Sequence, residues 1–343
     1  MLKRMLHKEV IIGISSFLIL NYSCLNQYNA YENPFPVSDL FDSIPYDVLG
    51  QGKLVFRREV YNSGQHYAAA YIVDIDKQNS FFREDMGEPT ISPDGSKIVF
   101  GLYSSYLNNS TDIYVTNITC SHYMRVSDIS GASPCWAWDG AKVVFVLDQS
   151  ISGVNHKLLY KQSPVQSPTD RSLIIDFYKS DPTIIPEGKV QLSSKGQYIM
   201  SSNGIYTFDA DGKNLNKIIP LQSDSQYYYS PAWSPDGTKI AVISLDCSKN
   251  NRIKNYSLIL FNSDGTNPNI LYTLSATDKV YAWSKKEYSV CWSPDGTKLA
   301  FTRPNDAGIN TTANIFVIKT DHTGFTQVTN NLFAYDSYLS WGQ

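Results

Sequence analysis

The chain has 343 residues, 42% of them hydrophobic, which is enough for a substantial core and excludes a disordered chain. Lys and Arg total 29 against 32 Asp and Glu, so the net charge of −3 gives no electrostatic reason to expect nucleic acid as a partner. The 24 Tyr and 15 Phe, with Gly and Pro scattered throughout, favour short strands joined by tight turns. The sequence therefore predicts an all-β protein.

Residues 1–23 have the layout of a secretory signal peptide. Basic residues precede an apolar run from Val10 to Leu20, which is too short to span a bilayer comfortably. Ser23 and Cys24 then resemble the end of a bacterial lipobox, although the usual Leu is displaced by one position. We expect Cys24 to be lipidated and residues 24–50 to form a tether. Cleavage without lipidation and an uncleaved anchor are the alternatives.

One sequence pattern recurs along the rest of the chain. Strong copies begin at Ile91, Trp233 and Trp292, each followed by Ser-Pro-Asp-Gly, and weaker copies begin at Trp136 and Leu192. The fourth positions of the copies fall at residues 94, 139, 195, 236 and 295, so the intervals are 45, 56, 41 and 59 residues. Such a period is typical of a four-stranded propeller blade with loops of variable length.

Each Ser-Pro-Asp-Gly segment predicts a tight hairpin. Pro presets φ for a type I turn, and Gly accepts the left-handed conformation through which the chain rejoins an antiparallel strand. A second hairpin follows, as in Ile205–Phe208 and Leu215–Ile219 around the turn Asp209–Lys213. A calcium loop at Asp209 and Asp211 is the alternative, but the further acidic ligands of an EF-hand are missing. Two hairpins make four strands.

The ends of the repeat region complete the count. Residues 53–86, with strands at Lys53–Arg57 and Ala70–Asp74, lack an innermost strand of their own, and Asp336–Gly342 can be laid over Ser289–Asp295. We expect this C-terminal segment to supply the missing strand, because closure removes exposed sheet edges. The sequence predicts a six-bladed β-propeller of four-stranded antiparallel blades over residues 51–343, with the ring closed by the C-terminal strand.

These repeats resemble the TolB-type, WD-like propeller repeat over about residues 53–343. Together with the N-terminal signal, the resemblance implies an exported protein of the bacterial cell envelope. We expect a monomeric outer-membrane lipoprotein that faces the periplasm or the cell surface and touches the membrane only through its lipid anchor. TolB carries a separate α/β domain before its propeller, for which residues 25–50 leave no room, so a role in the Tol–Pal system is not expected.

The predicted binding site lies on the face opposite the tight turns. Long connections are expected there at residues 101–111, 147–156, 244–256, 302–313, 179–188 and 276–288, and long loops on a rigid scaffold commonly carry function. Aromatic and charged residues gather at the same places, and we predict that they bind a protein or glycan of the cell envelope around the channel mouth. They are Tyr103, Tyr106, Tyr227, Tyr228, Tyr229, Tyr281, Trp283, Tyr288, Tyr335, Asp148, Asp246, Arg252 and Arg303.

A structural role is the alternative for the same residues. Side chains that lead into an inner strand also pack between blades, so at least one of Tyr227, Tyr228 and Tyr229 is expected to be buried, and the charged residues are expected to be solvated. The series Trp136, Trp233 and Trp292 is assigned to packing, because it recurs at the same position of the repeat.

Signals for catalysis are weak, so we expect a non-enzymatic binding protein without a cofactor or metal. No Gly-x-Ser-x-Gly or Cys-x-x-Cys occurs, and the His residues are scattered over different repeats. A polysaccharide lyase or hydrolase with its site at the channel mouth is the alternative, since oligogalacturonate lyases use related propellers with several His around a metal. Convergence of His66, His156 and His322 would favour it.

Four cysteines follow Cys24 in the sequence, and pairing must be considered in an exported protein. Cys135 and Cys291 occupy equivalent inner-strand positions three blades apart, while Cys120 and Cys247 are expected in turns on opposite faces. Since a disulfide needs Cα atoms within about 7 Å, we expect free thiols.

Overall fold

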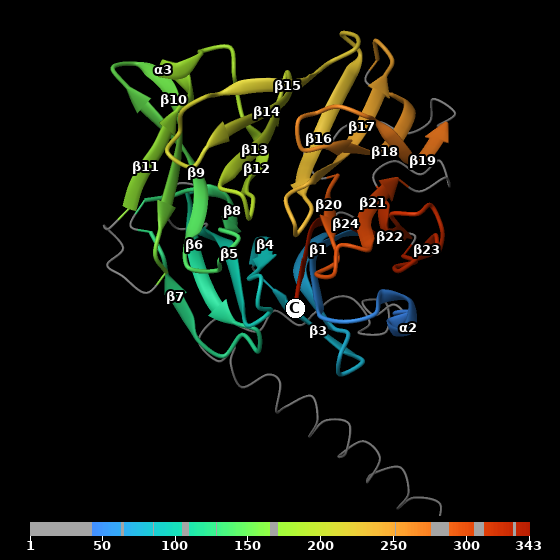
Figure 1. Ribbon diagram of the computed structural model, residues 1–343. Helices are drawn as coiled ribbons and strands as arrows, with labels where there is room; N and C mark the ends of the chain where they lie inside the picture. Colours follow the sequence, from blue (N-terminus) through green and yellow to red (C-terminus); the bar gives the residue numbers. More distant parts are fainter. Residues whose placement is uncertain are drawn as a thin grey trace, which may run out of the picture.

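The computed structural model is an all-β propeller built from antiparallel four-stranded sheets (Figure 1). It describes residues 43–62, 65–84, 86–104, 110–127, 129–164, 171–250, 252–275, 288–304, 312–331 and 334–343. The predicted signal peptide, Cys24 and most of the tether lie outside these ranges. Within them, no helix has the length and apolar character needed to cross a membrane.

Four of the sheets stand separately, and in each the strands are neighbours in chain order. The first holds β4 (Met86–Ile91), β5 (Lys97–Ser104), β6 (Ser110–Asn117) and β7 (Tyr123–Arg125). The second holds β8 (Ala132–Trp136), β9 (Val143–Ile151), β10 (Val154–Gln162) and β11 (Arg171–Asp176). The third holds β12 (Glu187–Leu192), β13 (Gln197–Ser202), β14 (Gly204–Asp209) and β15 (Asn216–Pro220). The fourth holds β16 (Gln226–Trp233), β17 (Lys239–Cys247), β18 (Ile253–Asn262) and β19 (Asn269–Ser275). The predicted four-stranded antiparallel blade is confirmed.

The remaining strands form one eight-stranded sheet, in the order β20-β21-β22-β24-β1-β2-β3 with β23 beside β22. They are β20 (Val290–Trp292), β21 (Lys298–Pro304), β22 (Ala313–Lys319), β23 (Thr326–Gln327), β24 (Ala334–Gly342), β1 (Lys53–Asn62), β2 (Gln65–Asp74) and β3 (Asn79–Glu84). A single parallel pair, Ala313 with Tyr335, links β22 to β24. The two halves of this sheet are thus joined at one point only.

The C-terminal strand β24 pairs with the first strand β1, as predicted. The antiparallel register runs from Lys53 opposite Gly342 to Val60 opposite Ala334. Arg58 of β1 and Asp336 of β24 are fully buried, and the guanidinium donates from Nε at 2.7 Å and from Nη2 at 2.9 Å to the two carboxylate oxygens. Thr329 donates a further hydrogen bond of 2.6 Å to this carboxylate. The two ends of the propeller are therefore held together by paired strands and a buried ion pair.

The repeated turns have the predicted conformation. Gly95, Gly237 and Gly296 have φ between +64° and +69°, and each donates its N–H to the Ser carbonyl three residues earlier at 2.8–2.9 Å. The Asp209–Lys213 segment is also a turn, because Asp211 accepts from the Lys213 N–H and Nζ.

Two of the connections predicted as long loops, residues 147–156 and 244–256, are largely strand, which corrects the sequence analysis. Strand β9 continues to Ile151 and β10 begins at Val154, so only Ser152 and Gly153 remain between them. Both have positive φ, at 52° and 80°, as the type I′ hairpin turn requires. Likewise β17 runs on to Cys247, which ends a strand instead of lying in a turn. Most of 276–288 and the middle parts of 101–111 and 302–313 lie outside the described residues.

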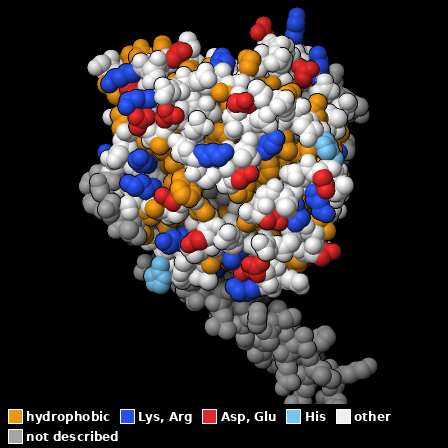
Figure 2. Space-filling view, in the orientation of Figure 1, with side chains coloured by type: hydrophobic (Ala, Val, Ile, Leu, Met, Phe, Trp, Pro, Cys, Tyr) orange, Lys and Arg blue, Asp and Glu red, His pale blue; other side chains and the backbone are white. Residues whose placement is uncertain are grey.

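The hydrophobic core lies between neighbouring sheets. One cluster joins Cys135 and Val144 of the second sheet to Tyr198 and Met200 of the third. On the outer surface, acidic and basic side chains are interspersed across the face shown in Figure 2. Two short helices, α2 (Tyr46–Leu49) and α3 (Phe177–Ser180), complete the described elements.

Candidate binding site at the axial cavity

A cavity of about 260 Å³ lies at the end of the inner strands that carries the Ser-Pro-Asp-Gly turns. Six stretches of chain line it, one from each inner strand and the turn that follows. The stretches fall within residues 90–93, 135–138, 189–194, 232–235, 291–294 and 339–343. Because every sheet contributes to its wall, the cavity lies on the axis around which the sheets are arranged.

Hydrogen bonds link neighbouring wall strands all around the cavity. Most involve a side chain of one strand and a backbone group of the next. They are Thr90 Oγ1 to the Pro134 carbonyl (3.0 Å), Cys135 Sγ to the Val190 carbonyl (2.9 Å), Trp233 N to Gln191 Oε1 (3.1 Å), Val290 N to Ser230 Oγ (3.3 Å), Leu339 N to Ser289 Oγ (3.0 Å) and Ile91 N to Ser340 Oγ (3.1 Å). The series begins and ends on β4, so the wall is rigidly held.

Tryptophans surround the mouth of the cavity. Trp136, Trp233 and Trp292 are only 5–7% exposed, which confirms their predicted packing role. Trp136 and Trp292 donate from Nε1 to the backbone carbonyls of Thr90 and Ala232 on the preceding wall strands. Trp138, by contrast, also lines the cavity and is 51% exposed. It is therefore the aromatic side chain at the mouth that a ligand can reach.

Lys189 of β12 places a positive charge inside the cavity. Its Nζ lies 3.4 Å from the Pro89 carbonyl on β4, and the side chain is partly buried. The surrounding protein removes water from the amine and so lowers the pKa of Lys189, an effect that Cys135, Glu88 and Cys291 partly offset. Burial in turn raises the pKa of the Cys135 and Cys291 thiols to about 12. These thiols are therefore protonated at neutral pH.

The acidic residues of the surrounding turns are occupied within their own turns. Asp236 accepts from Ser234 Oγ at 2.5 Å and from Thr238 N and Oγ1, and these hydrogen bonds lower the pKa of Asp236. Asp94 is held in the same way by Ser92 and Ser96. These carboxylates stabilise the hairpins and have little capacity left for a ligand.

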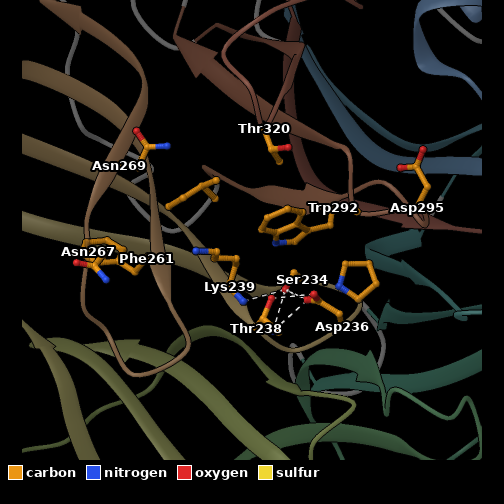
Figure 3. Close-up of a pocket in the computed structure, with 13 residues that line it drawn as sticks. Ser234, Asp236, Thr238, Lys239, Phe261, Asn267, Asn269, Trp292, Asp295 and Thr320 are labelled. Atoms are coloured by element: carbon orange, nitrogen blue, oxygen red, sulfur yellow. Dashed lines mark hydrogen bonds between the residues drawn. The ribbon is translucent and has the colours of Figure 1, made fainter.

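A second hollow, of about 520 Å³, lies beside the axial cavity between the fourth sheet and β20–β23 (Figure 3). Trp292 lies in its wall, with Asn267, Asn269 and Thr320 around it. Lys239 faces it too, but its Nζ donates to Asn262 at 2.7 Å. Its charged side chains, Asp236, Asp295 and Lys239, are hydrogen-bonded to neighbouring protein groups, so this hollow is the weaker candidate.

Of the five predicted aromatic residues whose side chains are described, four are interior, which corrects the sequence analysis for these four. Tyr228, Tyr229, Tyr288 and Tyr335 are 3–5% exposed, because the strand ends that carry them pack between neighbouring sheets. Tyr227 is half-buried and stacks on Tyr229 with ring centroids 6.3 Å apart. The expectation that at least one of the three consecutive tyrosines is buried is confirmed.

The predicted charged residues do not converge on one site. Asp148 is exposed and forms an ion pair of 2.6 Å with Lys157, while Asp246 accepts from Ser225 Oγ at 2.7 Å. Arg303 lies over the ring of Phe316, with 5.0 Å between its Cζ and the ring centroid. Arg252 donates from its backbone N–H to Ser248 Oγ. Each of these contacts is local to its own part of the propeller.

Other candidates fall outside the described side chains or residues. Tyr103 belongs to β5, but its side chain is not described, and Tyr106, Tyr281 and Trp283 lie outside the described ranges. The prediction that they contribute to a binding surface therefore stays a prediction.

Two of the three candidate histidines, His156 and His322, do not converge, and the His66 side chain lies outside the described part of the chain. His156 contacts the Asp176 carboxylate through Nδ1 at 2.8 Å, whereas His322 lies in an exposed turn at the opposite end of the sheets. Among the described residues, no three His, Cys, Asp or Glu side chains gather closely enough to hold a metal ion. Cys120, Cys135, Cys247 and Cys291 are buried thiols, as expected.

Sequence reasoning missed Lys189 and Trp138. A signal for Lys189 was present, since aligning the repeat copies places it where the others have Glu88, Ser133, Ser230 and Ser289. Lys189 is the basic residue at a position where these copies have serine or glutamate. A comparison of the repeat copies position by position therefore identifies Lys189.

The comparisons with known proteins define the fold. No protein-family model matches the chain, and no curated protein matches it significantly. TolB from Acinetobacter baumannii superposes with a TM-score of 0.62 at 16% identity, covering 85% of this chain and 66% of that one. Hydrazine synthase from Kuenenia stuttgartiensis gives 0.58 at 11% identity, covering 85% of this chain and 47% of that one. Oligogalacturonate lyase from Vibrio parahaemolyticus gives 0.51 at 12%, covering 82% and 80%.

The chain is a β-propeller of the kind found in TolB. It spans slightly less than two thirds of that TolB chain and about half of the synthase. Because the similar structures carry the names of a lyase and a synthase beside TolB, the shared fold does not decide between binding and catalysis.

Proposed function

We propose that this protein is a six-bladed propeller of the bacterial cell envelope that binds a ligand at the mouth of its axial cavity without catalysing a reaction. This mouth lies at the end that carries the tight turns, opposite to the face that the sequence analysis favoured. The observation that carries the proposal is the cavity itself, with a lysine amine inside it and an exposed tryptophan at its rim. Pockets of this kind, with an apolar wall and a few polar groups, are the usual place for ligands in a rigid scaffold.

The number of blades rests on the wall of the cavity. Six inner strands contribute to it, and each is hydrogen-bonded to the next. We count the eight-stranded sheet as two blades, β20–β23 and β24 with β1–β3, because one parallel residue pair joins them whereas β24 pairs with β1 over its length. On this count, the C-terminal strand completes the first blade and closes the ring.

Export and anchoring rest on the sequence alone. The basic and apolar segments before Cys24 have the order of a bacterial lipoprotein signal. Metabolic labelling with palmitate in a bacterial host is expected to label the wild type and not Cys24→Ser. Labelling of both, or of neither, would contradict the proposed anchor while leaving the binding site untouched.

The binding proposal can be tested with a matched pair of variants. Trp138 at the mouth and Leu173 on β11 belong to the same sheet and are both 51% exposed. Proteins and glycans captured from envelope fractions by the immobilised full chain are quantified for Trp138→Ser and for Leu173→Ser. An aromatic anchor contributes about 2 kcal/mol or more at an interface, so Trp138→Ser is expected to lower specific capture more than about tenfold.

The Leu173→Ser control distinguishes binding at the cavity mouth from binding elsewhere on the same sheet. Leu173→Ser is expected to capture the same ligands as the wild type. Equal capture by all three proteins would contradict a site at this mouth. Turnover of a polysaccharide by the purified protein would instead favour the lyase or hydrolase alternative.

A further inference from the structure

The inner strand β12 departs from the repeat in charge. The third residue before the motif is Glu88, Ser133, Ser230 or Ser289 in the other copies and Tyr338 in β24, but in β12 it is the basic Lys189. The inner strands β4, β8 and β16 each contain a β-bulge in which two residues lie opposite one of the next strand. The bulge of β12 is wider, because three residues lie between Glu187, paired with Ser201, and Gln191, paired with Ile199. Places where a repeated pattern fails are commonly functional, because the departure has no benefit for folding.

The Lys189 side chain reaches past one neighbouring wall strand. It starts on β12, which follows β4 and β8 in the order of the wall, yet its Nζ hydrogen-bonds the Pro89 carbonyl on β4. Lys189 lines the cavity together with Cys135 of β8 and Cys291 of β20, so its amine lies among several walls of the cavity.

This charge has little compensation in the described part of the chain. The hydrogen bond to Pro89 is long, at 3.4 Å, and no described carboxylate lies within ion-pair distance of the amine. The Glu88 carboxylate, which accepts a hydrogen bond from the Ser133 N–H, is the acidic neighbour and only partly offsets the effect of burial on the pKa of Lys189. The indole Nε1 of Trp233, which is 7% exposed and lines the same cavity, also has no hydrogen-bond partner. Buried donors without acceptors are costly, so the site favours an incoming anion.

We infer that the axial cavity binds the C-terminal carboxylate of a polypeptide, with Lys189 as its counter-ion and Trp138 in contact with the preceding residues. The inference rests on the proposed function, since it names the ligand of the same mouth. A carboxylate supplies the acceptor atoms that the Lys189 ammonium lacks, and such charge-assisted hydrogen bonds are stronger than neutral ones.

The size and chemistry of the mouth favour a peptide end over an acidic sugar. A volume of about 260 Å³ is small for a ligand pocket, so it suits the end of a chain. Sugar hydroxyls need many hydrogen-bond partners, but the Ser234 and Ser293 hydroxyls that line the cavity already donate to Asp236 and Asp295 within their own turns. Pro93, Pro235 and Trp138 offer apolar surface instead, which matches peptide side chains.

Equilibrium dialysis of the full chain tests this inference. The probes are a pool of N-acetylated pentapeptides with randomised last two residues and free carboxylates, the same pool as C-terminal amides, and oligomers of galacturonic acid, all quantified by mass spectrometry. We expect the wild type to retain the best free-acid peptides at least about tenfold over their amides. Lys189→Met is expected to abolish this preference.

A matched control variant and the wild type provide the two comparisons that can contradict the inference. Lys195→Met removes an exposed lysine on the turn that follows β12 and is expected to retain the preference. Three results would overturn the inference. The wild type could retain acids and amides equally, the preference could be lost in Lys195→Met alone, or the uronic acid oligomers could be retained instead of peptides. Since the acid–amide comparison uses the wild type, it does not depend on how Lys189→Met folds. If capture of a ligand depends on Trp138 but the wild type shows no preference for free carboxylates, this inference is wrong and the proposed function is still supported.

Discussion

Arg58 and Lys189 are two cations enclosed by the same propeller, and their surroundings differ. Arg58 is fully buried, with both carboxylate oxygens of Asp336 within 2.9 Å and the Tyr71 ring 4.9 Å from its Cζ. Lys189 has one long hydrogen bond to a carbonyl and faces an open cavity. The paired charge of Arg58 joins two strands, whereas the Lys189 amine has no ion pair among the described residues and is left available. The degree of pairing thus separates a structural cation from a binding cation.

Removing the partner of Arg58 is expected to have the largest effect. Asp336→Ala leaves a buried guanidinium without its counter-ion, so the free energy of unfolding should fall by about 3–5 kcal/mol. Urea denaturation followed by tryptophan fluorescence measures this loss. A loss below about 1 kcal/mol would show that the ion pair does not hold β24 to β1.

A pair of glycine variants tests how the C-terminus sits against the β4–β5 turn. Gly95 and Gly196 occupy equivalent turns with φ of 67° and 78°, but a Cβ on Gly95 would overlap the Gln343 backbone whereas one on Gly196 meets nothing within 4 Å. Gly196→Ala should lower the free energy of unfolding by about 1–2 kcal/mol through backbone strain alone. Gly95→Ala should lower it by roughly a further 1–3 kcal/mol because of the overlap. Equal losses in urea denaturation would mean that the C-terminus does not pack on this turn.

Replacing Lys189 is expected to raise the free energy of unfolding, in contrast to the changes at Asp336 and Gly95. The pKa of Lys189 is lowered in the folded state. Between that pKa and 10.5, the unfolded chain therefore binds the proton more tightly than the folded chain does. As a result, the stability of the wild type rises with pH through this interval. Lys189→Met should therefore be more stable than the wild type by roughly 1 kcal/mol at pH 7. The difference should close as the pH approaches 10.5, where Cys135 and Cys291 are still thiols.

Thermal unfolding of both proteins between pH 7 and pH 10.5 measures this difference. The neighbours Glu88, Cys135 and Cys291 are present in both proteins, so their own titration largely cancels in the comparison. A variant that is less stable than the wild type by several kcal/mol at pH 7 would instead give Lys189 a structural role like that of Arg58.

The smallest effect is expected at Asp148. Its ion pair with Lys157 is exposed, with 69% of the Asp148 side chain accessible. Asp148→Ala should change the free energy of unfolding by less than about 1 kcal/mol, because solvent screens such pairs. The same urea denaturation measures it, and a larger loss would mean that the strand extension of β9 depends on this contact.

Particular residues explain what the sequence predicted and what it did not. The blade was predictable because Ser-Pro-Asp-Gly specifies a hairpin through local backbone preferences, and Gly95, Gly237 and Gly296 adopt the expected left-handed conformation. The pairing of Asp336–Gly342 with β1 was also predictable, since the segment repeats the inner-strand pattern.

The site was less predictable because it depends on side chains that meet across the axis. Nothing near Lys189 in the sequence shows that its amine reaches Pro89, which is 100 residues away along the chain. The tyrosines were misjudged for a related reason: strand ends such as Tyr228 and Tyr229 are covered by neighbouring sheets, and burial of this kind is not visible in a single repeat. The predicted long loop at 147–156 failed because Ser152 and Gly153 suffice for a two-residue turn.

Site-specific photocrosslinking tests the central claim most directly. A benzophenone amino acid is placed at Trp138, at the mouth of the axial cavity, or at Asp148, near the other end of the same sheet and about 17 Å along β9 from Val143. After irradiation of living cells, we expect a discrete crosslinked species from position 138 and none from position 148. Crosslinks from position 148 alone would place the ligand on the opposite face and contradict the account.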